Sequence, residues 1–134
     1  MEELGRSRKV ERVMYRVQAL TSDPESPAKA RSLVRAELAG CQEEAVAATE
    51  LMVSELVTNA VVHGATPIRI ELEHDDNIVR AAVTDGGAEL PVLRTAQASA
   101  THGRGLKIVS SLADDWGIVE DETGKLVWFS LPCR

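Results

Sequence analysis

Aromatic residues and cysteines are both scarce in this chain. Phe, Tyr and Trp make up 3% of the 134 residues, so the interior must be built from Val, Leu, Ile and Ala. The two cysteines, Cys41 and Cys133, are far apart, match no metal-ligand spacing and are too few for a disulfide framework. We therefore expect two reduced thiols.

Long apolar runs and an excess of positive charge are also lacking. No stretch reaches the roughly 18 to 20 uninterrupted apolar residues of a membrane span, and no apolar run of the signal-peptide type follows the charged first residues. Fifteen Lys and Arg against 21 Asp and Glu give a net charge of −6, which disfavours direct binding of nucleic acid or of a membrane surface. These absences predict a cytoplasmic protein.

The composition that is present supports one folded domain. A hydrophobic content of 44% in 134 residues is enough for a single core. Residues 1–12 are polar and charged and are predicted to form a flexible N-terminal arm, although their basic cluster also suits an interaction arm. Residues 13–134 are predicted to form the domain.

Hydrophobic spacing predicts strands and helices in a mixed order. A two-residue period with Val13, Tyr15, Val17 and Ala19 on one face is typical of a half-buried strand. Helices are predicted from Ser26 to Gly40 and from about Gln42 to Val62, followed by a hairpin of strands 68–73 and 78–83, a mobile loop over 88–102, a helix opened by Gly103, and strands 116–119 and 126–131. This order predicts an α+β fold, a mostly antiparallel sheet with helices on one face.

The helix at 42–62 carries three polar residues at four-residue spacing. At about 100° per residue, Glu55, Asn59 and His63 share one face with apolar residues that include Leu51 and Val62. Burying an uncompensated carboxylate or amide costs on the order of several kcal/mol, so these side chains are either satisfied internally or line a cavity. An amide oxygen suits Mg²⁺, and a carboxylate one turn away suits a general base. A core or capping role is favoured for His63.

Two glycine-containing motifs follow this helix. Asp85-Gly86-Gly87 ends a predicted strand, where the carboxylate can accept a hydrogen bond from an exocyclic amine such as that of adenine, although a plain turn explains the triplet as well. Gly103-Arg104-Gly105 at a helix start can offer backbone N–H groups to an anion, with Arg104 adding charge. The phosphate-binding pattern GxxxxGK[ST] is absent.

Taken together and in this order, the motifs resemble those of the GHKL ATPase superfamily. The segment from Glu55 to Gly64 resembles its N-box, Asp85-Gly86-Gly87 its adenine-binding G1 box, and Gly103-Arg104-Gly105-Leu106 its G2 box. The resemblance covers roughly residues 24–132. The closing strand, residues 128–132, looks like that of the stand-alone bacterial anti-sigma-factor serine kinases.

The resemblance implies a Bergerat-type two-layer α/β sandwich that binds ATP and Mg²⁺. It implies Glu55 as catalytic base, Asn59 as the Mg²⁺ ligand, Asp85 as the adenine contact, and Gly87, Gly103, Arg104, Gly105 and Leu106 as further nucleotide contacts. The implied activity is that of a serine/threonine protein kinase. The implied partners are a sigma factor and a small anti-anti-sigma protein that accepts the phosphoryl group, and homodimer formation is left open.

Three departures from the family's pattern accompany this resemblance. Glu89 occupies a position that is often glycine, Leu126 lies nearest to the position of a threonine that supports the adenine site, and no lysine precedes the G2 glycines. Two alternatives therefore stay open. The first is an ATP-gated protein-binding module without significant kinase turnover, and the second is an interaction domain that binds no nucleotide.

Overall fold

The computed structural model describes residues 14–63, 67–86, 100–121 and 124–134, with the backbone alone for 100–105 and 121. Five strands and three helices are formed within these residues. In chain order they are β1 (Met14–Leu20), α2 (Ser26–Glu37), α3 (Glu43–Val62), β2 (Ile68–His74), β3 (Ile78–Asp85), α5 (Ala100–Leu112), β4 (Asp115–Asp121) and β5 (Gly124–Pro132).

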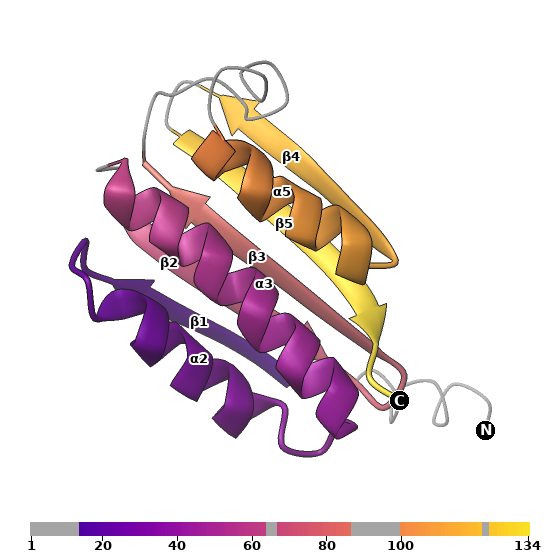
Figure 1. Ribbon diagram of the computed structural model, residues 1–134. Helices are drawn as coiled ribbons and strands as arrows, with labels where there is room; N and C mark the ends of the chain where they lie inside the picture. The colour runs from indigo at the N-terminus through magenta and orange to yellow at the C-terminus, as the bar shows by residue number, and fades with distance from the viewer. Residues whose placement is uncertain (1–13, 64–66, 87–99, 122–123) are drawn as a thin grey trace.

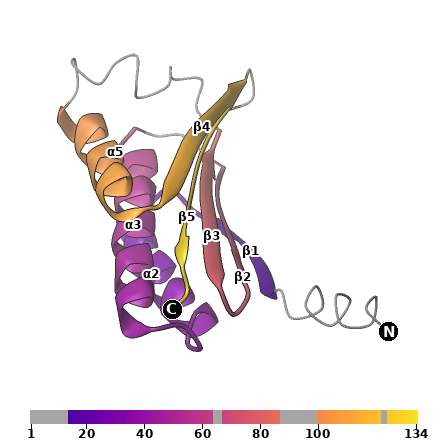
Figure 2. The same cartoon turned by 90° about the vertical axis from the view of Figure 1, so that its right-hand side faces the viewer.

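The five strands form one antiparallel sheet in the order β1-β2-β3-β5-β4. Figure 2 shows all three helices on one side of this sheet, and Figure 1 shows α3 between α2 and α5. The helices and the sheet enclose a core of aliphatic side chains with one buried aromatic residue, Phe129. The predicted α+β sandwich with an antiparallel sheet covered on one face is confirmed.

The edge strand β1 forms as predicted, but the face that carries Tyr15, Val17 and Ala19 points away from the helices. Arg16 lies opposite Leu72, which is fully buried, so Arg16 is on the helix side, where it forms an ion pair of 3.6 Å with Glu37 of α2. Tyr15 and Val17 therefore lie on the open face, and Tyr15 is 60% exposed. The prediction of a half-buried apolar face is wrong because periodicity gives two faces without saying which one meets the core.

The open face of the sheet carries a shallow hollow of about 370 Å³. Its lining comes from all five strands: Tyr15, Glu71, Glu73, Arg80, Ala81, Ala82, Asp115, Trp128, Phe129 and Ser130. One wall is the indole of Trp128, which lies against Gly117. A Cβ atom on Gly117 would be only 2.7 Å from Nε1 of Trp128. None of the residues that the sequence singled out for nucleotide binding lines this hollow.

The central helix α3 packs against α2 through the shared core, and Arg35 links the two helices at the surface. Arg35 donates hydrogen bonds to Glu43 at the start of α3 and to Glu50 two turns further on. These contacts raise the pKa of Arg35, and the Arg35 guanidinium lowers the pKa of Glu43.

Within the described residues, α3 alone is long and apolar enough for a membrane span, but half of that stretch is buried in the protein, as expected of a core helix.

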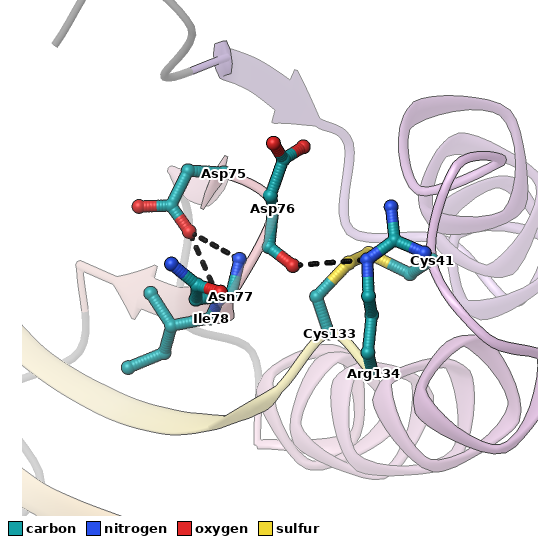
Figure 3. The surroundings of a disulfide bond; sticks show 7 residues. All are labelled: Cys41, Asp75, Asp76, Asn77, Ile78, Cys133 and Arg134. Atoms are coloured by element: carbon teal, nitrogen blue, oxygen red, sulfur yellow. Dashed lines mark hydrogen bonds between the residues drawn. A yellow bond between two sulfur atoms is a disulfide. The ribbon is translucent and has the colours of Figure 1, made fainter. Parts of the chain in front are cut away.

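The expectation of two reduced thiols is wrong, because Cys41 and Cys133 form a disulfide bond with their Cα atoms 4.9 Å apart. Figure 3 shows this bond joining the turn after α2 to the residue that follows β5. The backbone is tied at the same place, since Gln42 N–H donates to the Cys133 carbonyl at 2.9 Å. A separation of 92 residues gave no sign of this proximity, because only the tertiary fold brings the two thiols together.

The turn between β2 and β3 packs beside this disulfide (Figure 3). Asp75 accepts hydrogen bonds from the backbone N–H groups of Asn77 and Ile78, at 2.7 and 2.9 Å, and these bonds lower the pKa of the Asp75 carboxyl. Arg134 donates to the Asp76 carbonyl at 3.2 Å. The predicted hairpin is confirmed, and its turn, the chain end and the α2–α3 turn meet at one end of the sandwich.

Candidate functional site

The sequence-predicted site residues gather at the other end of the sandwich. The C-terminal ends of α3 and β3 and the N-terminal end of α5 all lie towards the upper left of Figure 1, where β5 also begins. The antiparallel order explains this arrangement, because α3 and β3 both run towards this end whereas α5 and β5 both leave it. Motifs that are up to fifty residues apart in the sequence therefore share one end of the fold.

Glu55 and Asn59 lie on the flank of α3 that faces away from α2. Glu50, which binds Arg35, marks the flank that faces α2. At about 100° per residue, Glu55 and Asn59 lie roughly 140° and 180° around the helix from Glu50. That is the side on which α5 packs against α3, and both side chains are half-buried there.

The predicted apolar face around these residues only partly enters the core. Met52 and Leu56 are buried, but Leu51 is 43% exposed and Val62 is 62% exposed. Glu55 and Asn59 therefore lie at the border of the core. A half-buried carboxylate keeps part of its hydration, so the large cost assumed for burying these groups does not arise.

His63 is the C-terminal capping residue of α3. Its backbone N–H donates to the carbonyl oxygen of Asn59 at 3.0 Å, which closes the last turn of the helix. The capping role favoured for this histidine is confirmed. The following residue, Gly64, lies outside the described residues.

Asp85 ends β3 in the interior of the sheet. Its neighbours across the sheet are Ile68 on β2 and Lys125 on β5. Since side chains alternate along a strand and Val83 and Ile68 are core residues, Asp85 points to the helix side, and it is 8% exposed. Gly87 lies outside the described residues.

The helix α5 begins earlier than predicted. It starts at Ala100, so Gly103, Arg104 and Gly105 lie within its first two turns and do not open it. Only the N–H groups of the N-cap residue and of the first three helical residues lack an intrahelical partner, and the helical ones here belong to residues 100–102, before Gly103. Ala is a strong helix former and the helix continues through the glycines, which the prediction had taken as a boundary. Leu106 is 6% exposed and packs in the core.

Sequence reasoning missed two residues at the start of β5. Gly124 lies against the end of β3, and a Cβ atom there would overlap the backbone carbonyl oxygen of Asp85. The next residue, Lys125, lies directly opposite Asp85 and on the same face. Leu126, the residue nearest to the position of the family's threonine, lies opposite Thr84 on the open face of the sheet, so its side chain points away from the side on which Asp85 lies.

Gly124 is expected to tolerate no side chain. We predict that Gly124→Ala lowers the free energy of unfolding by roughly 1 to 3 kcal/mol, because a methyl group would push β5 away from the Asp85 carbonyl and the residue has a positive φ of 156°. Urea unfolding measures this loss. The matched control is Gly40→Ala, since a Cβ at Gly40 meets no atom within 4 Å. Equal stability of the two variants would contradict the close contact.

The oxygen ligands available at this end of the fold suit a metal ion that binds together with a phosphate-containing ligand. Among the described residues, no group of three or more His, Cys, Asp or Glu side chains could hold a metal ion. Asn59 offers one neutral oxygen at the edge of the core. Mg²⁺ usually keeps several waters and binds through one or two protein oxygens together with substrate phosphates, so the residues present fit a nucleotide-bound Mg²⁺.

The chain belongs to the histidine kinase-like ATPase domain family, whose model matches residues 20–131. Membership of this family implies nucleotide binding. A search of curated proteins finds no match.

One solved structure with the same fold contains the RsbU and RsbW domains of Rv1364c from Mycobacterium tuberculosis. The two folds agree with a TM-score of 0.69 at 24% sequence identity, over 87% of this chain and 32% of the other. The likeness at this identity concerns the fold. This chain spans about a third of that longer protein chain.

Proposed function

We propose that this protein is an Mg²⁺- and ATP-dependent protein serine kinase of the anti-sigma-factor type. The observation that carries the proposal is the placement of Glu55 and Asn59 on the α5 side of α3, at the end of the sandwich where Asp85 ends β3. Phosphoryl transfer from ATP requires a general base, an oxygen ligand for the metal ion and a group that binds adenine. Glu55, Asn59 and Asp85 offer these three groups at one end of an ATPase-family domain.

Each predicted residue has a role in this proposal. Asn59 holds the metal ion that accompanies ATP, and the ion supplies charge neutralisation at the phosphates when bound. Asp85 accepts a hydrogen bond from the adenine amine. Glu55, one turn before Asn59 on α3, takes the proton of the attacking hydroxyl group.

The first residues of α5 provide the anion-binding part of the site. The N–H groups of residues 100–102 and the positive end of the helix dipole favour negative charge at this end of α5. We propose that Gly103, Arg104, Gly105 and Leu106 complete the phosphate-binding segment with Gly87.

The proposed partners are a sigma factor and a small anti-anti-sigma protein whose serine accepts the phosphoryl group. Two findings support this choice, namely the match to the ATPase family and the likeness in fold to a structure that contains an RsbW domain. The most direct test is incubation with γ-labelled ATP and small candidate acceptor proteins, with label expected on serine.

Asn59→Ala tests the nucleotide-binding half of the proposal. We expect the affinity for ATP in the presence of Mg²⁺ to fall roughly 10- to 100-fold, because the metal ion loses its protein oxygen. Isothermal titration with and without EDTA measures this effect, and the wild type and the variant should bind metal-free ATP equally. Thr58→Ala, at the neighbouring half-buried position, is the matched control. An Mg²⁺-dependent affinity that survives Asn59→Ala would remove Asn59 from the metal site.

A second candidate function is an ATP-gated protein-binding module without kinase turnover. The open face of the sheet favours it, because Tyr15, Val17 and Val119 expose apolar surface there beside the hollow. This candidate predicts that a partner binds with an affinity that ATP changes, and that no label reaches any acceptor at any partner concentration.

A further inference from the structure

Lys125 is a buried lysine for which the proposed mechanism so far has no use. It is 8% exposed, as is Asp85, which lies directly opposite on the neighbouring strand. Lysine is almost never buried to this extent in proteins without an interaction for its ammonium group. The burial of Lys125 therefore calls for an explanation in terms of the groups around it.

The sheet fixes where the Lys125 side chain starts. Partners directly opposite in an antiparallel pair have Cβ atoms about 4.5 to 5.5 Å apart and point to the same face. Val127, two residues along β5, is a core residue, so Lys125 points to the helix side, as Asp85 does. The contact of Gly124 with the Asp85 carbonyl fixes β5 and β3 together at this point.

This pair presents two complementary hydrogen-bonding groups side by side. A carboxylate only accepts hydrogen bonds and an ammonium only donates them. The Watson–Crick edge of adenine has the matching order, an amine donor at N6 beside an acceptor at N1. A carboxylate alone can bind the N6 amine but leaves N1 without a donor.

We propose that Lys125 is a base-reading residue that donates a hydrogen bond to adenine N1 while Asp85 accepts one from the N6 amine. This inference rests on the proposed nucleotide binding and assigns a second contact to the base. It gives the buried ammonium a partner in the ligand and makes β5, as well as β3, a determinant of nucleotide specificity.

The test combines a variant with an altered nucleotide. In 1-deaza-ATP a C–H group replaces N1, so it cannot accept this hydrogen bond, whereas 7-deaza-ATP keeps N1 and serves as the control nucleotide. For the wild-type protein we expect 1-deaza-ATP to bind about 10-fold or more weakly than ATP. The control nucleotide 7-deaza-ATP, which keeps N1, should bind about as tightly as ATP. This arm needs no variant, so it holds even where a substitution at Lys125 prevents folding.

Lys125→Met should bind ATP about 10-fold or more weakly than the wild type, and should bind ATP and 1-deaza-ATP equally. Lys29→Met, at an exposed position on α2, is the matched control and should behave as the wild type. Isothermal titration gives the affinities, and circular dichroism confirms that each variant is folded.

The outcomes separate this inference from the function on which it rests. Binding of ATP by the wild type without any loss for 1-deaza-ATP would overturn the role of Lys125 and leave the nucleotide site in place. An equal loss for 1-deaza-ATP in the wild type and in Lys125→Met would do the same. Failure of the wild type to bind ATP at all would overturn both the inference and the proposed function.

Discussion

Glu55→Gln is expected to leave the binding of ATP and Mg²⁺ unchanged and to slow phosphoryl transfer about 100- to 10,000-fold. The range is the usual contribution of a positioned general base. Glutamine has nearly the same size as glutamate and keeps hydrogen-bonding capacity, so the half-buried position on α3 should accept it. Its amide cannot take a proton from a serine hydroxyl, so only the transfer step should suffer.

Two measurements on the same preparation make this test specific. Isothermal titration reports binding, and label transfer from γ-labelled ATP to an acceptor protein reports the reaction. The matched control is Glu44→Gln, the same substitution at an exposed position near the other end of α3, which should change neither. Undiminished transfer by Glu55→Gln would show that another group takes the proton.

Reduction of the disulfide is expected to lower the free energy of unfolding by about 4 to 5 kcal/mol. The bond closes a loop across 92 residues, and the chain-entropy estimate for loops of this size lies in that range. Small domains are stable by only about 5 to 15 kcal/mol, so reduction would remove a large part of the total. Urea unfolding with and without dithiothreitol measures the difference.

The variant with Cys41→Ser and Cys133→Ser serves as the control for this measurement. It should unfold at the same urea concentration in both buffers, near the midpoint of the reduced wild type. The hydrogen bond from Gln42 N–H to the Cys133 carbonyl does not depend on the sulfur atoms, so the native fold should persist in the variant. Equal midpoints for oxidised and reduced wild type would show that the bond adds no stability.

The local elements of this fold could be predicted from the sequence because their signals are local. The turn at 74–77 and the apolar strands on either side of it specify the β2–β3 hairpin, which the structure confirms. The helical spacing from 42 to 62 likewise specifies α3. Periodicity could not say which face of β1 meets the core, so the prediction for Tyr15 and Val17 was wrong.

Features that depend on tertiary contacts were not predictable in this way. The disulfide joins two residues whose proximity exists only in the folded chain. The contact of Gly124 with Asp85 and the position of Lys125 opposite Asp85 both come from the register between β3 and β5, which residue patterns do not specify. The family motifs at Glu55, Asn59 and Asp85 were found from the sequence, but their roles stay predictions.

The placement of the two tryptophans gives each face of the sheet its own fluorescence reporter. Trp116 lies opposite Phe129 and packs against the core on the helix side, whereas Trp128 lies over Gly117 on the open face. The emission of Trp116 should therefore respond to what happens beneath the helices, and that of Trp128 to anything that covers the sheet. Single-tryptophan variants would let one titration distinguish a nucleotide from a protein partner.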